Sequence, residues 1–318
     1  MSKKTKYSLC IHGGAGVITK EDLSNKDKRL ITADLEASLA AGETVLNKGG
    51  TAIDAVCAAV EVLENSIHFN AGKGAVYTRS GQHLLEASIM DGATLKAGAL
   101  ANSKRIKNPV LFAKTLLNRD DVVFVSGDSV DVLAEGLGHS MVENTYFDTS
   151  FRKEQWELAQ SLSDDAIFLD HSNLKMGTIG AVALDTYGNL AAATSTGGMT
   201  NKLDGRIGDS AMIGCGTYAK NKTCAVSCTG IGEFFMRATV ASTVSNLMEY
   251  GGLSLEKAAY QAIHEHQAKL GGDGGLIAID AHGNITMPYN SQGMYRAFVS
   301  ERLNKKSVFI WDKEEKLN

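Results

Sequence analysis

Long apolar runs are missing from the sequence. It has no stretch of about 18 apolar residues, the length that a membrane-spanning helix needs. The first residues, MSKKTKYSLC, are basic but lead into only a short apolar segment, whereas a signal peptide carries about 7–15 apolar residues in a row. These absences predict a cytoplasmic protein with no membrane partner.

Charge of one sign is not concentrated anywhere in the chain. The net charge is −4 and the isoelectric point lies near 6.1. No basic stretch with interleaved aromatic residues occurs, although such stretches are typical of nucleic-acid binding. We therefore expect neither nucleic acid nor an anionic membrane surface among the partners.

Cysteine is present in an odd number, as Cys10, Cys57, Cys215, Cys224 and Cys228. Their spacings fit no metal motif, and without an export signal they are expected to stay reduced. Cys224 and Cys228 fall on one face of a predicted strand, which favours core packing. The cysteines thus predict neither a metal site nor a redox site.

Several common catalytic motifs are incomplete. GGAG (13–16) and GIGE (230–233) do not complete the G-x-G-x-x-G pattern of dinucleotide binding, and AGKGA (71–75) lacks the first glycine of a P-loop. No G-x-S-x-G nucleophile elbow is present, which argues against an α/β-hydrolase. We expect no redox cofactor.

Proline is scarce and glycine is abundant, with 2 and 33 residues in a chain of 318. The glycines follow no collagen period and form no low-complexity tract. They indicate tight turns and close approaches of backbone to backbone. Active sites that are built from backbone groups need such approaches.

Helical patterns open the chain after a first strand at YSLCIHGGAG. Residues 26–50 have helical apolar spacing and end at Gly49 and Gly50, a common stop signal. Thr51, with Asp54 three residues later, resembles a capping box. A second helix is therefore predicted directly after the first.

Mixed strand and helix patterns follow. Residues 75–92 predict a hairpin with two strands that turns around Ser80 and Gly81. Pro109 suits the first residue of a helix. A strand at 121–127 and a helix at 128–138 are expected next.

The second half of the chain is richer in strands. Residues 150–176 begin as a helix and become polar and irregular, which is typical of a linker. Strands are expected from Thr178 to 196, two helices between Glu233 and Lys269, and a last hairpin at 274–290. The strands are joined as hairpins rather than as βαβ units. Stacked antiparallel sheets with helices outside, an α/β/β/α arrangement, fit this pattern.

A threonine in the middle of the chain poses the central question. In KMGTIGAVALD (175–185), apolar alternation predicts a strand that opens at Thr178, directly after Gly177. Threonine has a high strand propensity, which is the simpler explanation. The other explanation is that the chain is cut between Gly177 and Thr178 and that the new amino terminus is the catalyst.

Clusters of small hydroxyl residues and glycines favour the second explanation. They lie at 177–185, 193–210 and 227–233, and each adjoins an apolar strand. Turn chemistry alone does not easily account for three such clusters. A shared site at the ends of the strands does.

These segments resemble the N-terminal nucleophile (Ntn) hydrolases of the plant-type asparaginase and isoaspartyl peptidase family. The resemblance covers nearly the whole chain and rests on IHGGAG, FNAGKGAV, EASIMDG, GTIGAVA, STGGMTNK, GRIGDS and CTGIGE, in this order. It implies an α/β fold, the four-layer αββα Ntn sandwich with two stacked, mainly antiparallel sheets. It also implies that the enzyme acts on small molecules.

The resemblance further implies a single domain, 1–318, that cuts itself between Gly177 and Thr178. Residues 1–177 would form the α chain, with a linker at about 157–177, and residues 178–318 the β chain. Two processed protomers would form an (αβ)2 assembly. The linker is short, which is expected to affect only the speed of processing.

The chemistry explains why a threonine must stand at the new terminus. A hydroxyl is a weak nucleophile and needs an adjacent base. A free α-amino group, with a pKa near ~8, supplies that base. Before cleavage the same nitrogen is an amide and cannot accept a proton, so the uncut chain should lack hydrolase activity.

The resemblance implies catalytic roles for four positions. Thr178 would attack the side-chain amide or isopeptide carbonyl and form a β-aspartyl ester. Thr196 would lie beside it and tune its hydroxyl, unless it is an ordinary threonine at a strand end. The Thr229 hydroxyl and the Gly230 N–H would form the oxyanion hole, where removal of one donor costs ~10²–10³ in rate.

Substrate binding is implied for four more positions. Arg206 would clamp the α-carboxylate of the substrate with its planar guanidinium. Asp209, helped by the Gly232 carbonyl, would hold the α-ammonium, and Asn70 would also line the site. The simpler alternative is that Arg206 and Asp209 form a solvated surface pair.

An alkali-ion loop is implied by VLENSIHFNAGKGAV. No catalytic cofactor is expected, but a structural Na⁺ could be wrapped there by backbone carbonyls. The matching carbonyls belong to Leu63, Glu64, Ser66, Phe69, Ala71 and Lys73. A plain helix-to-strand loop is the alternative.

The predicted activity is hydrolysis of β-aspartyl (isoaspartyl) dipeptides and of L-asparagine. One alternative is a glycosylasparaginase-type hydrolase, against which STGGMTNK and the missing signal peptide argue. Another is a binding protein that keeps the amino-acid clamp but does not process itself. The intact Gly177-Thr178 pair, Thr196 and Thr229 argue against that alternative.

Overall fold

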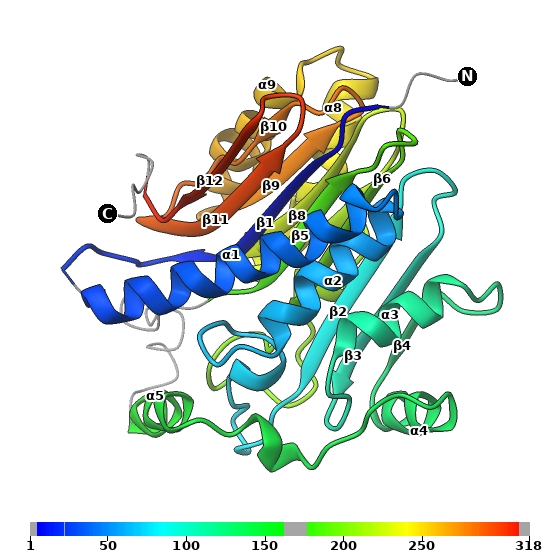
Figure 1. Ribbon diagram of the computed structural model, residues 1–318. Coiled ribbons are helices and arrows are strands. Elements are labelled where there is room, and N and C mark those ends of the chain that lie inside the picture. The colour runs from blue at the N-terminus through cyan, green and yellow to red at the C-terminus, as the bar shows by residue number, and fades with distance from the viewer. Residues whose placement is uncertain (1–4, 22, 162–176, 312–318) are drawn as a thin grey trace.

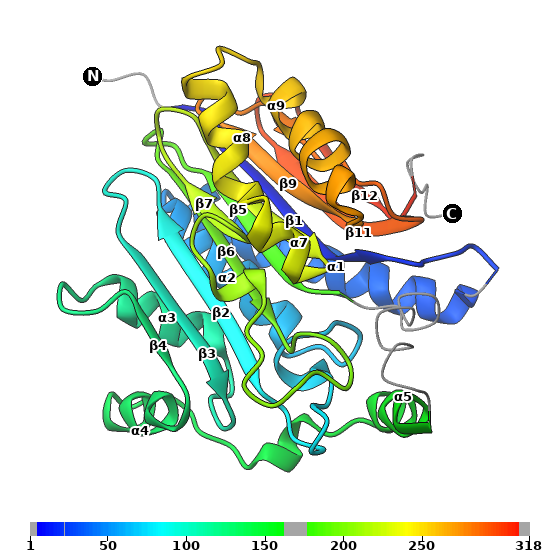
Figure 2. The same ribbon diagram turned by 180° about the vertical axis from the view of Figure 1, so that it is seen from behind.

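Two stacked β-sheets with helices on both outer faces form the body of the protein. The computed structural model describes residues 5–21, 23–161 and 177–311. Helices cover the large sheet on the side that faces the viewer in Figure 1 and the small sheet on the side that faces the viewer in Figure 2. The predicted four-layer αββα fold is confirmed.

The large sheet has eight strands. Their order is β12 (Lys305–Phe309), β11 (Gly293–Ser300), β1 (Ser8–Gly16), β5 (Ile179–Leu184), β6 (Leu190–Thr196), β2 (Leu85–Asp91), β3 (Ala97–Ser103) and β4 (Phe124–Ser126). Neighbours run antiparallel except β3 and β4, which are parallel. The central β5 and β6 are buried along their whole length because both faces of the sheet are covered.

The small sheet has four antiparallel strands. Their order is β10 (Ile285–Thr286), β9 (Gly274–Asp280), β8 (Cys224–Gly230) and β7 (Thr217–Ala219). Apolar side chains fill the space between the sheets, among them Val182 and Leu190 from the large sheet and Ile277 and Ile279 from the small one. This layer fixes how the strand ends of the two sheets meet.

Three helices cover the outer face of the large sheet. They are α1 (Asn25–Asn47), α2 (Ala52–Glu64) and α3 (Pro109–Leu117). The Thr51 hydroxyl accepts a hydrogen bond from Asp54 N at 3.2 Å and caps α2 as the sequence predicted. Pro109 is the first residue of α3, also as predicted.

Three helices cover the small sheet, where the sequence predicted only two. They are α7 (Gly232–Arg237), α8 (Val240–Glu249) and α9 (Leu255–Gln261), and α9 continues in a π turn (Ala262–Gln267) and a 3₁₀ turn (Ala268–Leu270). Thr239 adopts left-handed backbone torsions, with φ at 44°, and separates α7 from α8. No local sequence signal marks that break, because a β-branched residue rarely takes this conformation.

One further prediction was wrong, and one segment with strands had no prediction, for a common reason. Only one arm of the predicted 75–92 hairpin is a strand, because residues 75–84 form a loop and β2 pairs instead with β3 and β6. The segment after Arg296, for which the sequence predicted no element, forms the second half of β11 and all of β12. In the first case the partners of β2 follow it in the sequence, as β3 and β6. In the second case the partner of β11 is β1, at the other end of the chain.

Peripheral elements complete the description. They are α4 (Asp128–Gly136), α5 (Ser150–Ser161) and 3₁₀ turns at Gly72–Gly74, Asn144–Phe147 and Asp209–Ala211. Of the predicted linker at about 157–177, the first five residues belong to α5, and residues 162–176 lie outside the described residues. In the part of the chain that the structure describes, no helix is long and apolar enough to cross a membrane.

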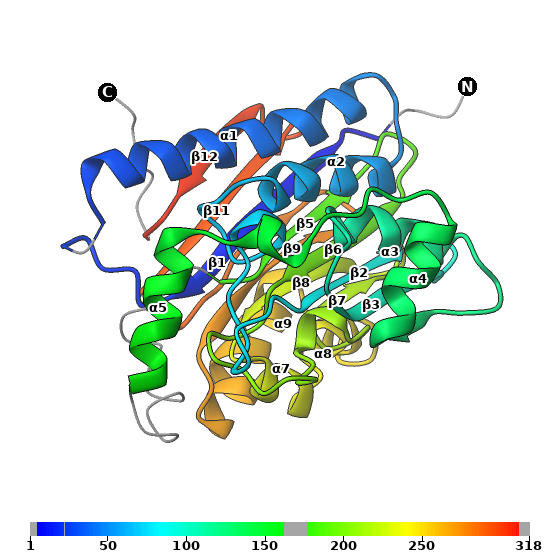
Figure 3. The same ribbon diagram turned by 90° about the horizontal axis from the view of Figure 1, so that it is seen from below.

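The register of the central strands places the predicted site. Ile179 of β5 pairs with Ser195 of β6, so the residues just outside this pair, Thr178 and Thr196, are neighbours. The end of β8 reaches the same edge from the small sheet. Figure 3 shows α1 and α2 on one side of the stacked sheets and α7 to α9 on the other.

Candidate active site

Thr178 and Thr196 lie side by side at the edge of the large sheet. The Thr178 hydroxyl donates to Thr196 Oγ1 at 3.0 Å, and the Gly198 N–H donates to the same oxygen at 3.0 Å. The exposed fractions of Thr178 and Thr196 are 8% and 2%. Thr196 therefore orients the Thr178 hydroxyl, and it is more than an isolated threonine at a strand end.

Glycines surround the predicted cleavage point. A Cβ on Gly177 would lie 2.9 Å from Thr229 Oγ1 and 3.1 Å from Gly14 Cα. Gly14 has φ at +111°, and a Cβ there would lie 2.5 Å from Gly177 Cα. Only glycine permits this approach of two backbones. The HGGAG segment thus packs directly against the Gly177-Thr178 bond.

Thr229 at the end of β8 faces the same point from the small sheet. It is fully buried, and its Oγ1 accepts a hydrogen bond from Ala15 N at 3.2 Å. Since that bond uses a lone pair, the hydroxyl proton is available to another acceptor. A Cβ on Gly230 would lie 2.4 Å from Asp273 O, so this position has no room for a side chain.

Asn70 holds the turn that follows Thr196. Its Nδ2 donates to Gly198 O at 2.6 Å, its Oδ1 accepts from Val76 N at 3.1 Å, and its carbonyl accepts from Gly197 N at 3.0 Å. The structure therefore places Asn70 beside the nucleophile cluster, with its amide engaged by the backbone on both sides.

Arg206 is held by a carboxylate that sequence reasoning missed. Its Nε and Nη2 each lie 2.9 Å from an oxygen of Glu233, which stands in the first turn of α7. Only 14% of the Arg206 side chain is exposed. Glu233 occupies one edge of the guanidinium, and Nη2 also donates to Met199 Sδ at 3.4 Å. A second carboxylate on the other edge would bind through Nη1 and displace this contact with sulfur.

Asp209 lies next to Arg206 and is buried, so the two are not a solvated surface pair. Burial raises the Asp209 pKa to about 7, against the lowering effect of Arg206 and with a further increase from the nearby charge of Glu86. A Cβ on Gly232 would lie 2.9 Å from both Arg206 Nη2 and Asp209 Oδ1. The glycine lets its backbone lie close to both a cation and a carboxyl.

A second ion pair behind Arg206 also escaped the sequence analysis. Lys202 Nζ lies 3.1 Å from Glu86 Oε1, with exposed fractions of 1% and 0%, and the other Glu86 oxygen accepts from Gly208 N at 2.9 Å. Burial lowers the Lys202 pKa, and Glu86 partly offsets this. Lys202 is the last residue of STGGMTNK and Glu86 is the first residue of EASIMDG, but 116 positions separate them in the sequence. No spacing rule connects residues so far apart.

The 63–74 loop adjoins the site through two contacts. Asn70 provides one, and the other joins Glu64 Oε1 to the Ser195 hydroxyl at 2.7 Å. A Cβ on Gly72 would lie 2.3 Å from Glu64 O, and one on Gly74 would lie 2.1 Å from Phe69 O. The loop is therefore folded tightly against its own carbonyl groups.

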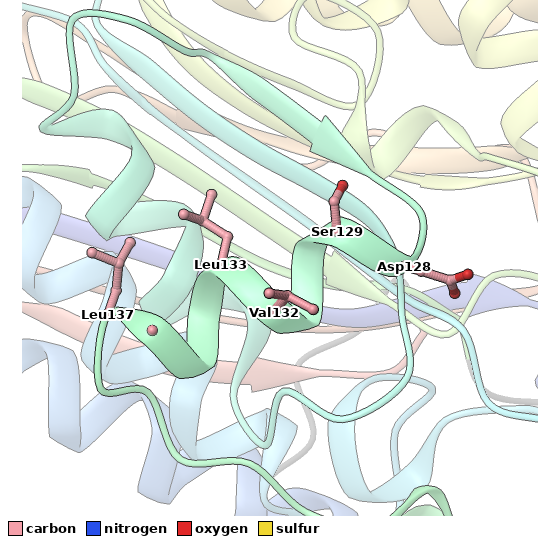
Figure 4. A pocket seen from close by; sticks show the side chains of 6 residues that line it. Asp128, Ser129, Val132, Leu133 and Leu137 are labelled. Atoms are coloured by element: carbon pink, nitrogen blue, oxygen red, sulfur yellow. The ribbon is translucent and has the colours of Figure 1, made fainter.

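Neither a metal site nor the surface hollow along α4 offers a better candidate for the active site in the described residues than the cluster around Thr178. Among the described residues, no group of three or more His, Cys, Asp or Glu side chains could hold a metal ion. Figure 4 shows a surface hollow along α4. Its lining residues are Asp128, Ser129, Val132, Leu133, Gly136 and Leu137, and none of them is a predicted site residue.

Comparison with known proteins gives a consistent result. A family model described as Asparaginase matches residues 5–309. The chain is 48% identical over 299 residues to the "Isoaspartyl peptidase" of Escherichia coli (strain K12), with 92% of each chain covered. It is 47% identical to the protein of that name from Salmonella typhimurium, with coverage of 92% and 95%. It is 36% identical to the "Plant-type L-asparaginase" of Pyrobaculum calidifontis, with coverage of 92% and 96%.

Proposed function

Because the chain belongs to the asparaginase family, we propose that it hydrolyses β-aspartyl (isoaspartyl) dipeptides and L-asparagine through a threonine nucleophile. The single observation that carries the residue assignment is the Thr178–Thr196 hydrogen bond of 3.0 Å beside a buried Thr229. A cation and a carboxyl that could anchor an amino acid lie in the same cluster.

Processing comes first in the proposed mechanism. The Thr178 hydroxyl attacks the Gly177 carbonyl carbon, the C–N bond breaks, and the nitrogen takes the proton. Water then splits the resulting ester, leaving a carboxylate on Gly177 and a free amine on Thr178. The close packing of Gly177 against Thr229 Oγ1 and Gly14 supports this step, since it restricts the backbone directly before Thr178.

Hydrolysis of substrate repeats the same chemistry. The amine of Thr178 takes the hydroxyl proton, and Oγ1 attacks the amide carbon of the substrate. The Thr229 hydroxyl and the Gly230 N–H stabilise the oxyanion. The leaving amine receives the proton, and water then cleaves the β-aspartyl ester to release aspartate.

The charged residues would anchor the aspartyl part of the substrate. The Nη1 side of Arg206 would bind the α-carboxylate and displace the contact between Nη2 and Met199 Sδ. Asp209 with the Gly232 carbonyl would bind the α-ammonium. Glu233 keeps the guanidinium oriented while the substrate enters. Gly232 supports this assignment because a side chain there would collide with both groups, so only glycine brings its backbone this close to them.

We also propose that the loop carbonyls of Leu63, Glu64, Ser66, Phe69, Ala71 and Lys73 hold a structural Na⁺ and that catalysis needs no cofactor. The tight winding around Gly72 and Gly74 supports the cation. A melting temperature that rises with Na⁺ but not with tetramethylammonium would support it further. Equal melting temperatures in both salts would overturn it.

The proposed organisation is one domain that becomes an α chain, 1–177, and a β chain, 178–318, assembled as (αβ)2. Light scattering on the purified protein should give twice the 33.8 kDa of the chain. A mass of 33.8 kDa would contradict the dimer but would leave the proposed reaction unaffected.

Intact mass under denaturing conditions is the decisive experiment. Two species, one beginning at Thr178, together with aspartate release from β-aspartyl-leucine and ammonia release from asparagine, would support the whole proposal. A single stable chain that binds aspartate would favour the non-processing binding protein instead. Cleavage of a sugar–asparagine bond without dipeptide hydrolysis would favour a glycosylasparaginase.

A further inference from the structure

The ion pair between Lys202 and Glu86 is shielded from solvent on both sides. The exposed fractions of the two side chains are 1% and 0%. Taking two charges out of water costs free energy that their attraction often fails to offset, so a buried ion pair is weak evidence for stability. The pair is therefore expected to serve by what it holds in place.

The side chain of Lys202 lies against the turn that follows Thr196, here called the nucleophile turn (196–198). A Cβ on Gly198 would lie 2.7 Å from Lys202 Nζ and 2.8 Å from its Cδ. Gly198 has φ at +83°, and its N–H donates to Thr196 Oγ1, the oxygen that also accepts from the Thr178 hydroxyl. The lysine stem therefore supports the backbone group that bonds to the neighbour of the nucleophile.

The ammonium of Lys202 is fixed by the beginning of β2 and by the residue before it. Nζ donates to Leu84 O at 2.9 Å and lies 3.1 Å from Glu86 Oε1. The backbone of Lys202 is held as well, because its carbonyl accepts from Arg79 N at 2.8 Å. Both ends of this long side chain are thus fixed, so the stem has little freedom to move away from Gly198.

Glu86 connects the nucleophile turn with the groups that would anchor the substrate. In the sheet it pairs with Thr196 across β2 and β6. Its second oxygen, Oε2, accepts from Gly208 N at 2.9 Å. Gly208 belongs to the anchor segment (206–209), and a Cβ there would lie 2.8 Å from Arg206 Nη1. One carboxylate thus bonds both to the lysine behind the nucleophile turn and to the backbone of the anchor segment.

Only a carboxylate can make this bridge with both of its oxygens. They accept from Lys202 Nζ and from Gly208 N, whereas an amide of the same shape has one acceptor oxygen and would turn N–H groups toward one of the two donors. The carboxylate also lies near Asp209, and two like charges repel each other. A buried carboxylate in such a place needs a cation, and Lys202 supplies it.

We propose that Glu86 and Lys202 are positioning residues that set the distance between the nucleophile turn and the anchor segment. The inference rests on the proposed function, because it assumes that Thr178 attacks a substrate that Arg206 and Asp209 hold. The substrate is held at one end, and its carbonyl carbon must meet Thr178 Oγ1 at the other. A shift of either segment would leave the substrate bound but would move its carbonyl away from the attacking oxygen.

Lys202→Met keeps the apolar stem and removes the ammonium, so Glu86 loses its link to the nucleophile turn. We expect kcat with asparagine to fall about tenfold or more, because a small misplacement of a reacting group costs up to ~10²-fold. KM should change less than about threefold. The matched control is Lys220→Met, which removes the ammonium that pairs with Glu249 at the opposite end of the small sheet from Thr229. It should keep kcat within about twofold of the wild type.

A double variant separates positioning from stability. Lys202→Met and Glu86→Gln each leave one buried charge without its partner, so each should lower the melting temperature. The double variant buries no unpaired charge and should recover most of that loss. Its kcat should stay low, because the link to the nucleophile turn is still missing.

Processing provides a second readout, because it does not use the anchor segment. In the variants of the pair, the processing half-time should therefore change less than about threefold while kcat falls about tenfold. Melting temperature, processing half-time, kcat and KM would be measured on the full chain for the wild type, Lys202→Met, Glu86→Gln, the double variant and Lys220→Met.

The outcomes separate this inference from the proposed function. Four results would overturn the positioning role alone: an unchanged kcat, a kcat that recovers with the melting temperature in the double variant, a double variant that does not fold, or processing that slows as much as kcat falls. A wild-type chain that neither processes nor hydrolyses either substrate would overturn the proposed function and this inference with it. A low kcat in the double variant, with recovered melting temperature and a KM near that of the wild type, would support the role of the pair.

Discussion

The two ends of the candidate site differ in how they use charge. The hydroxyl end, made of Thr178, Thr196 and Thr229, is held by hydrogen bonds from backbone and hydroxyl groups. The charged end contains two cations and three carboxyls, all largely buried. They are Lys202, Arg206, Glu86, Glu233 and Asp209.

The difference follows from what each end must do. In the proposed reaction the hydroxyl end handles a carbonyl whose charge develops only in the transition state, so neutral donors suit it. In the same proposal the charged end binds a zwitterion, which suits a cation and a carboxyl that lie side by side. Burying five charged groups together is costly, and the excess carboxyl is the one whose pKa is raised to about 7.

Removal of the nucleophile should have the largest effect. Thr178→Ala is expected to remain one chain and to lose both hydrolase activities, because neither the attacking oxygen nor the new terminus can form. Intact mass and ammonia release measure this. Thr178→Ser keeps the hydroxyl and should still process. Cleavage of the Ala variant at the same bond would contradict the role assigned to the hydroxyl end.

Loss of one oxyanion donor should come next. Thr229→Val keeps the shape of the side chain but removes the hydroxyl, and kcat should fall by ~10²–10³. KM should change little, since the charged end still anchors the substrate. Steady-state kinetics on processed enzyme measure both values, with Thr229→Ser as the control. A rise in KM with unchanged kcat would show that the two ends are not divided in this way.

The charged end should determine how kcat/KM depends on pH. Asp209 must be ionised to bind the α-ammonium, so kcat/KM should fall about tenfold for each pH unit below 7. Asp209→Asn should have a lower and flat profile over that range. Assays from pH 5 to 9 would show this. A slope that survives in the Asn variant would assign the titration to another group.

The same group affects stability with the opposite trend. In the folded protein the Asp209 carboxyl keeps its proton up to about pH 7, whereas its ordinary pKa is 3.8. Its contribution to the free energy of unfolding is therefore complete below pH 3.8 and is lost as the pH rises through about 7. Asp209→Asn should remove this loss, which denaturant unfolding at several pH values would measure.

The smallest effect is expected from a carboxyl behind the hydroxyl end. Burial raises the Glu64 pKa to about 8, although bonds from Ser195, Val110 and Asn108 lower it. The group is therefore neutral at pH 6, and Glu64→Gln should change the free energy of unfolding there by only about 1 kcal/mol. Between its ordinary value of 4.5 and about 8, the wild type should lose stability with rising pH relative to the Gln variant.

That comparison tests whether the hydroxyl end is truly uncharged. Thermal unfolding at pH 6 and pH 9 provides the measurement, with Glu61→Gln as a control at a partly exposed glutamate on the same helix. A large destabilisation of Glu64→Gln at pH 6 would mean that an ionised carboxylate lies behind Thr196.

Local chemistry made much of the fold predictable from the sequence. The cap at Thr51, the proline that starts α3 and the apolar spacing of α1 each involve residues within a few positions of one another. The hydroxyl end was predictable too, because glycine and threonine sit next to each other at 177 and 178, and the motif order indicates the family.

Tertiary structure alone decided the partners that lie far apart. Strand β2 could have paired with the segment before it, and only the packing of the sheet shows that β3 and β6 are its neighbours. Glu86 and Lys202 stand 116 positions apart, and His12 and Ser227, whose side chains share a hydrogen bond, stand 215 apart. Such pairs leave no period in the sequence, because many loops can close at similar entropic cost. The sequence therefore indicated the proposed nucleophile, and the stacked sheets determined which buried groups surround it.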